Sequence, residues 1–293
     1  MKAKTIQEIT DRMTHLPFYE IASILCNFAD IDTTKRLNHS ILFWCDDKNS
    51  GFHPYEECLG KTQNCLLGIT SSLSNMNLSV IHSQKRINSK YFNEMGYTDY
   101  DVYRYYYYVF CHGLSTIHDL LRKLVVILFD IRMKGKMIRW DEMEKQLKEK
   151  HEEQLVRLLD LFYSKIKLHD DKRNRASHEG LLTNNALLPF YSTHLITTIY
   201  KNHSTNDYSK YIEGTKENKR FLADTKQKYV SQLIKTIEET MDSIESLMDV
   251  LLPKFIEKID PSFILTHKDD LKRVNNENVI KFVLSSIEET NQL

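Results

Sequence analysis

Residues 155–178 read LVRLLDLFYSKIKLHDDKRNRASH and join an apolar stripe to a run of charged residues. In the first half, apolar side chains recur at the spacing of one helix face, at Leu155, Leu158, Leu159, Phe162 and Ile166. This spacing predicts a helix that packs the apolar face against a core. The charged half, which follows Leu168, would then lie at the end of that helix.

The segment before it also predicts helical structure. Residues 99–132 are strongly apolar, with tyrosine in the first half and leucine and valine in the second, which indicates a long core helix. Lys-Gly-Lys at 134–136 interrupts the pattern. Asp141 with Glu144 three residues later resembles a capping box, so we expect the next helix to begin at Asp141. The two helices should form an antiparallel hairpin.

Apolar periodicity predicts further helices, over residues 17–30, 33–44, 56–77, 221–252 and 276–289. The 293 residues include only 8 Gly and 5 Pro, too few for the turns of many short strands. We therefore expect an all-α fold, a helical bundle with additional N-terminal and C-terminal helices. The polar segment 79–98 indicates a boundary. Residues 1–95 would form an N-terminal helical region of unknown role, and residues 96–293 the bundle.

The composition favours an intracellular, cytoplasmic protein. Its cysteines are odd in number and unlike a secreted disulfide framework, so we expect buried thiols at Cys26, Cys45, Cys58, Cys65 and Cys111. The N-terminus lacks the apolar stretch of a secretory signal, and the longest apolar run, Leu124–Phe129, is far too short to span a membrane. Lys plus Arg and Asp plus Glu both number 40, so nucleic-acid binding would depend on a local basic cluster.

The charged half ends in Arg173-Asn174-Arg175-Ala176-Ser177-His178, whose residue types suit phosphoryl chemistry. We expect Arg173, Asn174 and His178 to be catalytic. A histidine with a pKa of ~6.5 exchanges a proton near neutral pH, as general base or acid. An arginine presents forked donors and a permanent charge to phosphate oxygens that gain negative charge.

The spacing on an ideal helix constrains how these three residues cooperate. Asn174 and His178 lie one turn apart on the same face, so Asn174 would orient His178. Arg173 and His178 diverge by roughly 140° at 3.6 residues per turn. Arg173 would therefore use its length, lie where the helix begins, or act across a dimer interface on the histidine of the other subunit.

The motif resembles the R-x4-6-H signature of the HEPN superfamily (higher eukaryotes and prokaryotes nucleotide-binding), in which a small polar residue often follows the arginine and an acidic residue such as Glu179 recurs after the histidine. The resemblance implies a helical up-and-down bundle of HEPN type. Many members of this superfamily are metal-independent RNases of toxin-antitoxin, abortive-infection and CRISPR systems, and others have no nuclease activity.

What the resemblance implies for this chain is specific. The RNA 2′-hydroxyl would attack the adjacent phosphate, leaving a 2′,3′-cyclic phosphate and a 5′-hydroxyl, with no metal and no cofactor. The composite site would lie between the two motifs of a homodimer. RNA is then the expected partner, and an antitoxin or regulatory protein could restrain a toxic enzyme.

Basic residues near the motif are the expected RNA-binding groups. Lys167, Lys172 and Arg175 form a local cluster with Lys165 around the helix end. On the preceding helix, His118 and Arg122 lie one turn apart and could add to a phosphate site, although an ordinary polar edge is the commoner reading.

Other readings of the same residues remain open. Basic residues in a last helical turn followed by Gly180 are typical of an ordinary helix end. The tyrosine-rich stretch 100–108 could stack bases, but core packing is favoured because Tyr103, Tyr107 and Phe110 fall at helical spacing. The doublets Asp46-Asp47 and Asp170-Asp171 could bind a divalent ion, but cap and surface roles are commoner.

Two functions are therefore considered. The first is a metal-independent endoribonuclease of HEPN type, with a toxin or defence effector as the expected biological role. The second is a non-catalytic helical scaffold, or a nucleic-acid-binding module, that keeps the fold without using the motif. A solvent-filled dimer cleft with two facing motifs would favour the first, and a His178 buried against core residues would favour the second.

Overall fold

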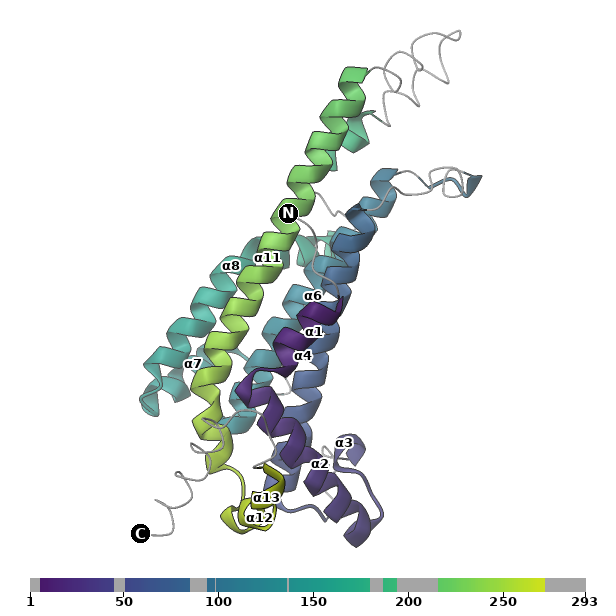
Figure 1. The fold of residues 1–293 in the computed structure, drawn as a ribbon. Helices are drawn as coiled ribbons and strands as arrows, with labels where there is room; N and C mark the ends of the chain where they lie inside the picture. Colours follow the sequence, from purple (N-terminus) through teal and green to yellow (C-terminus); the bar gives the residue numbers. More distant parts are fainter. Residues whose placement is uncertain are drawn as a thin grey trace. The chain divides into compact units, whose positions relative to one another are not determined.

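The computed structural model describes residues 6–44, 51–84, 94–97, 99–135, 137–179, 187–193 and 216–271. The helices in these ranges are α1 (Ile6–Thr14), α2 (Pro17–Leu37), α3 (Ile41–Trp44), α4 (Pro54–Gln84), α6 (Asp99–Leu128), α7 (Trp140–Glu149), α8 (Glu153–Glu179), α11 (Lys216–Glu257), α12 (Pro261–Thr266) and α13 (Lys268–Leu271) (Figure 1). Within the described ranges there is no strand. The chain is all-α, as the sequence predicted.

The chain divides into two compact units. The first unit comprises residues 1–9, 72–115 and 165–240, and the second unit comprises residues 10–71, 116–164 and 241–293. Each of the long helices α4, α6, α8 and α11 therefore contributes residues to both units. The boundary expected at 95/96 is not tested by this division and stays a prediction.

The core of the first unit contains buried aromatic side chains from α6 and α11. Its largest fully buried side chains include Tyr107, Phe110 and Tyr229. Gly113 allows α6 to approach α4, because a Cβ at this position would lie 2.6 Å from Met76 Cγ. A substitution here would have to move that packed methionine.

The core of the second unit is mainly aliphatic. Leu25, Leu66, Ile69 and Leu124 are fully buried, and Phe18 of α2 packs on Phe255 of α11 with ring centroids 5.1 Å apart. Burial of such side chains contributes about 1.5–3 kcal/mol each, so it holds helices whose exposed faces are polar.

The amphipathic stripe that predicted α8 is confirmed. Leu155, Leu159, Phe162 and Ile166 are buried, and Leu158 is half-buried. Of the apolar segment 99–132, residues 99–128 form α6, with its deepest residues on one face, and the helix ends four residues earlier than predicted.

Helix boundaries near the N-terminus differ from the prediction. The two helices expected over 17–30 and 33–44 are one helix to Leu37, followed by the short α3. Thr33 is fully buried, so the core continues through the expected break, and Asn38 ends α2 in the left-handed conformation at φ 57°.

The polar connection expected from residue 79 is also wrong at its start, because α4 continues to Gln84. Val80 is fully buried, and Ser79 and Ser83 donate their hydroxyls to carbonyls one turn earlier, at 2.8 Å in both cases. Small hydroxyl residues can therefore be buried inside this helix without losing a hydrogen bond.

The expected capping box at Asp141 does not form. The N-cap residue of α7 is Arg139, with no side-chain cap bond, and Asp141 lies in the first turn, where it favours the positive end of the helix dipole. The chain then breaks again before α8, with His151 at φ 60°. Between Leu147 and Leu155 there is no apolar side chain to hold a continuous helix against the core.

At the other end of the chain, α11 continues past Pro253 to Glu257 instead of ending there. Phe255 and Ile256 beyond the proline are buried, and their packing offsets the hydrogen bond that proline removes. The helix predicted over 276–289 lies outside the described residues.

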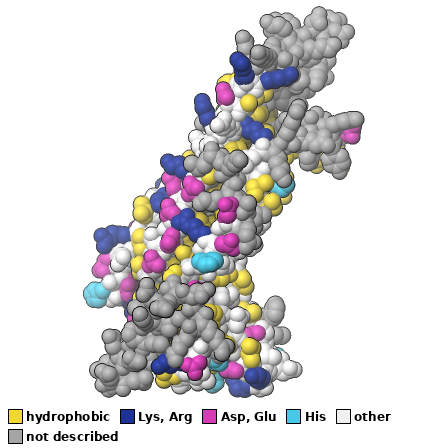
Figure 2. Space-filling model, in the orientation of Figure 1, with side chains coloured by type: hydrophobic (Ala, Val, Ile, Leu, Met, Phe, Trp, Pro, Cys, Tyr) yellow, Lys and Arg dark blue, Asp and Glu magenta, His cyan; other side chains and the backbone are white. Residues whose placement is uncertain are grey.

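On the face shown in Figure 2, basic and acidic side chains are intermixed. Cys26, Cys58, Cys65 and Cys111 are buried thiols outside any disulfide, as predicted, and Cys45 lies outside the described residues. Among the described helices, none has the length and apolarity that crossing a bilayer requires.

Candidate functional site

The motif occupies the last two turns of α8. Arg173 and Asn174 are half-buried, and the helix continues through Glu179. His178 lies in the final turn, and its side chain is outside what the structure describes, so its catalytic role stays a prediction. Because α8 is continuous here, position 178 lies about 140° around the helix axis from position 173.

Asp170 organises the first two motif residues. Its Oδ1 accepts hydrogen bonds from Arg173 Nη2 at 2.9 Å and from Ser115 Oγ of α6 at 2.6 Å. Its Oδ2 accepts one from Asn174 Nδ2 at 3.3 Å. The Asp170 side chain is only 15% exposed, so its charge needs this compensation. Asp170 therefore holds Arg173 and Asn174 from one turn earlier and connects α8 to α6.

Arg173 keeps donors for a further acceptor after pairing with Asp170. Its side chain is 26% exposed, and its Nε is buried without a hydrogen-bond partner among the described residues. A guanidinium has five N–H donors, and a buried donor without a partner is unfavourable until an acceptor arrives. An anionic phosphate oxygen is an acceptor of the matching charge.

His169, four residues before Arg173, lies in a cluster of neutral side chains with Tyr107 and Cys111 of α6. His169 Nδ1 is 3.1 Å from the Tyr107 hydroxyl and 3.9 Å from Cys111 Sγ. Burial, with a smaller contribution from the charge of Lys172, lowers the pKa of His169 from 6.5 to about 4. Burial also raises the pKa of Cys111 to about 12. His169 is therefore neutral at physiological pH and anchors α8 rather than carrying charge to the site.

The comparisons with known proteins bear on this geometry. A family model for Cthe2314-like HEPN domains matches residues 66–251, more than half of the chain, and the match includes Ser115, Asp170 and the motif. The chain belongs to the HEPN superfamily. No curated protein and no solved structure gives a significant match. The HEPN match begins inside α4, before the predicted boundary at 95/96, and ends inside α11.

The basic residues predicted to bind RNA on α8 of this HEPN protein differ in exposure. Lys167 and Arg175 are exposed. Lys172 is half-buried with Nζ 5.5 Å from the centroid of the Tyr107 ring, and burial lowers its pKa. Lys172 therefore packs its charge against an aromatic face, whereas Lys167 and Arg175 are accessible to a phosphate backbone.

The two predicted residues on α6 belong to the second unit. His118 stacks on Tyr163 with ring centroids 5.1 Å apart. Arg122 is 13% exposed, and its Nη2 donates to the carbonyl of Ile138 at 2.6 Å, which fixes the chain between α6 and α7. Burial lowers the pKa of Arg122. In this structure Arg122 supports the fold, and the RNA-binding role predicted for both residues stays a prediction.

Sequence reasoning missed Asp170, Ser115 and His169 as parts of the site. It considered Asp170 only as one half of a possible metal doublet. No group of three or more His, Cys, Asp or Glu side chains that could hold a metal occurs among the described residues, and Asp46-Asp47 lies outside them. The available signal was the spacing, because Asp170 lies three and four residues before Arg173 and Asn174.

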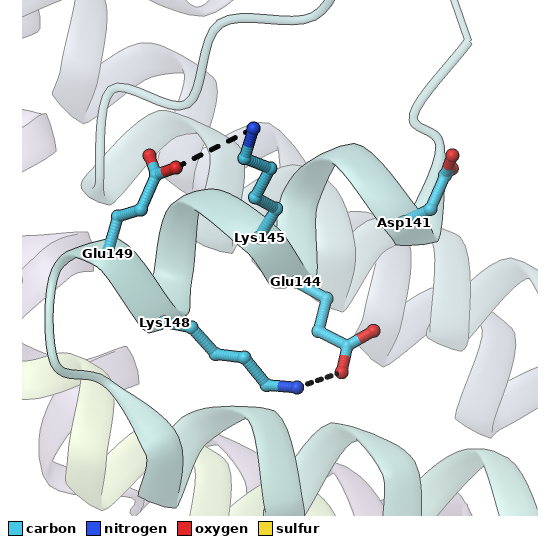
Figure 3. Close-up of a pocket in the computed structure, with 5 residues that line it drawn as sticks. All are labelled: Asp141, Glu144, Lys145, Lys148 and Glu149. Carbon is cyan, nitrogen blue, oxygen red and sulfur yellow. Dashed lines mark hydrogen bonds and ion pairs between the residues drawn. The ribbon is translucent and has the colours of Figure 1, made fainter.

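A hollow of about 500 Å³ on α7 is a weaker candidate for the HEPN site. It is lined by Asp141, Glu144, Lys145, Lys148 and Glu149 (Figure 3). Lys148 pairs with Glu144 at 2.6 Å, and Lys145 with Glu149 at 3.9 Å. These pairs lie at helical spacing on the outer side of one helix, so the hollow is an ordinary charged surface.

Proposed function

We propose that this HEPN protein is a metal-independent endoribonuclease with Arg173, Asn174 and His178 as its catalytic residues. The observation that carries the proposal is the state of Arg173, which Asp170 fixes in place while its Nε remains without an acceptor. A guanidinium fixed before substrate arrives stabilises developing phosphate charge without reorganisation.

The reaction uses the substrate's own nucleophile. His178 removes the proton from an RNA 2′-hydroxyl, the 2′-oxygen bonds to the adjacent phosphorus, and the bond from phosphorus to the 5′-oxygen breaks. The 5′-oxygen takes up a proton from water, and the protonated His178 returns its proton to solvent. The products are a 2′,3′-cyclic phosphate and a 5′-hydroxyl. Arg173 compensates the charge of the pentacoordinate phosphorus, which is the task a metal ion performs in other nucleases.

The proposed enzyme is a homodimer. Positions 173 and 178 lie about 140° apart around α8, so Arg173 of one copy and His178 of the other make the easier composite site. The exposed Lys167 and Arg175 bind the RNA backbone, with Lys172, His118 and Arg122 as further proposed contacts. The proposed biological role is that of a toxin or defence effector restrained by a partner protein.

A scaffold function is the second candidate. It is favoured by the ion pair that already neutralises Arg173 within its own chain, since a structural arginine requires nothing more. RNA cleavage distinguishes the two candidates.

The test is incubation of the purified full chain with a mixed RNA pool in EDTA, followed by analysis of the cut ends. We expect cleavage with cyclic phosphate ends, loss of cleavage in His178→Ala, and a dimer by light scattering. His178→Ala should keep the thermal midpoint, and unfolding of this variant would favour the scaffold. Activity that requires Mg²⁺ or Mn²⁺ would contradict the proposed chemistry.

A further inference from the structure

An exposed aromatic ridge lies on α6. It consists of Tyr105, Tyr108 and His112, and these three residues define the α6 ridge. Tyr105 is 63% exposed and Tyr108 is 37% exposed, and His112 is also exposed. Their spacing of three and four residues places them along one side of the helix. The prediction that the tyrosine-rich stretch packs in the core holds for Tyr103 and Tyr107 but not for these outward-facing residues.

Exposed aromatic rings are unevenly distributed over the chain. Every tyrosine and phenylalanine that is exposed in the described ranges belongs to the first unit, and these residues are Tyr97, Tyr105, Tyr108, Tyr191 and Phe221. The exposed large apolar residues of the second unit are all aliphatic: Ile31, Leu67, Met137, Leu161 and Leu265. Exposure of aromatic rings therefore accompanies the motif, which also belongs to the first unit.

The ridge lies on the same helix and in the same unit as Ser115 of the candidate site, and Ser115 itself is buried. His112 lies three residues before Ser115 on α6, and Ser115 donates to Asp170, which holds Arg173. Tyr108 and Ser115 are seven residues apart, so they lie within about 20° of each other around the helix. The exposed ridge therefore ends within one helical turn of the residue that links α6 to Asp170 and Arg173.

The charges beside the ridge suit a polyanion. Arg104 is exposed one turn before Tyr108, although Asp101 pairs with it at 3.7 Å. At the motif end, Arg175 on α8 is exposed, and it belongs to the same unit as the ridge. The rings of Tyr108 and His112 are nearly parallel, with an interplanar angle of 14° and centroids 6.3 Å apart. Successive bases of one strand can therefore stack on these two rings with their planes parallel.

We infer that the α6 ridge is a stacking platform for the bases of single-stranded RNA and delivers the strand to Arg173. The inference rests on the proposed ribonuclease function and adds the form of its substrate. Aromatic side chains bind unpaired bases through their π faces with little regard to sequence. In an A-form duplex the bases stack on one another and are closed to such side chains.

The test measures binding of a fluorescent 12-residue oligouridine, and of an RNA duplex of equal length, to the full chain in the His178→Ala background. The ridge variant is Tyr105→Leu with Tyr108→Leu, which removes both rings and keeps apolar side chains. The corresponding Phe pair keeps the rings. Phe221→Leu on α11 is the matched control, because it removes a ring that is 55% exposed elsewhere in the same unit.

We expect the Leu pair to weaken oligouridine binding about tenfold or more, and the Phe pair and Phe221→Leu to change it less than about twofold. Duplex binding should be equal for all variants. Equal oligouridine binding by the Leu and Phe pairs, or no oligouridine binding by the parent protein, would overturn the inference. A monomeric Leu pair in light scattering, where the Phe pair is dimeric, would instead make the ridge a contact between two copies.

These outcomes separate the inference from the function on which it rests. Ridge-dependent binding without cleavage by the unmodified chain would reject the ribonuclease and keep the stacking platform. Cleavage of oligouridine with an unchanged KM in the Leu pair would keep the ribonuclease and reject the platform.

Discussion

Glu56 in the second unit and Asp170 in the first unit are carboxylates with similar partners and different surroundings. Glu56 is 2% exposed and accepts hydrogen bonds from Thr33 at 2.6 Å, from Arg36 at 2.5 Å and from the backbone N–H of His53 at 2.7 Å. Asp170 likewise has one hydroxyl and one arginine among its donors.

The difference lies in what each arginine does after pairing. Arg36 also donates Nη1 to the carbonyl of Gly51 at 3.0 Å, so it connects α2 to the segment before α4. Arg173 pairs within its own helix, and its buried Nε has no partner among the described residues. The comparison teaches that an arginine–carboxylate pair alone does not indicate a functional site. The unpaired Nε distinguishes Arg173 from Arg36, but Arg122, which supports the fold, also has a buried Nε without a partner among the described residues.

The largest expected effect in this comparison comes from replacing each of the two arginines by lysine. Arg173→Lys keeps the charge and loses the planar fork, so RNA cleavage should fall about 100-fold with little change in thermal midpoint. Arg36→Lys should lower the midpoint and leave cleavage per folded molecule unchanged. Initial rates and thermal unfolding of both variants check this, and equal cleavage by the two variants would remove the distinction between the pairs.

Glu56→Gln should mainly affect stability. Breaking a buried ion pair is costly, but Arg36 is 38% exposed, so we expect the free energy of unfolding to fall by about 2 kcal/mol in urea titrations at pH 7. The control is Glu57→Gln, whose partner Lys61 lies 3.2 Å away in a pair that is much more exposed than Glu56, with an expected loss below about 1 kcal/mol.

The stability effect of Glu56→Gln should also depend on pH. Burial raises the pKa of Glu56, but hydrogen bonds from Thr33, Arg36 and the His53 backbone outweigh this effect, and its pKa is lowered from 4.5. The stabilisation is therefore fully present above pH 4.5 and is lost as the pH falls through the lower pKa of the folded state. The stability difference between the parent and Glu56→Gln should shrink on acidification, and a constant difference would contradict the assignment.

Asp170→Asn should give a smaller and different effect. The substitution removes the charge that fixes Arg173 but keeps a side chain that can hydrogen-bond Ser115, so we expect kcat to fall about tenfold with KM nearly constant. Ser115→Ala, which removes one neutral donor, serves as the control. An Asp170→Asn protein with normal kcat and reduced stability would make Asp170 a structural counterpart of Glu56.

The smallest expected effect is that of Arg175→Ala. Arg175 is exposed, so its loss should weaken RNA binding a few-fold and leave the cut ends unchanged. The slope of the logarithm of the binding constant against the logarithm of the salt concentration should become smaller by about one. Binding titrations at several salt concentrations measure this. A loss of cleavage as large as that of Arg173→Lys would mean that the motif contains a second essential arginine.

The parts that sequence predicted are those set by local spacing. The stripe from Leu155 to Ile166 predicted α8 because one helix brings these residues to one face. Asp170 could not be assigned, since its role depends on Ser115, which lies 55 residues earlier in the sequence. The capping signal at Asp141 failed because acidic residues also favour the first turn after the cap. The predicted helix ended before Pro253, because the sequence alone does not show that Phe255 beyond the proline is buried.

The half-buried His169 provides a spectroscopic reporter beside the motif. With a pKa of about 4, its imidazole should keep the NMR chemical shift of the neutral form at pH 5.5, where a histidine of ordinary pKa is mostly protonated. Its resonance can therefore be separated from those of exposed histidines by a pH titration alone. Because Arg173 follows one helical turn later, RNA bound at Arg173 should shift this resonance, and binding can be observed without a label on either molecule.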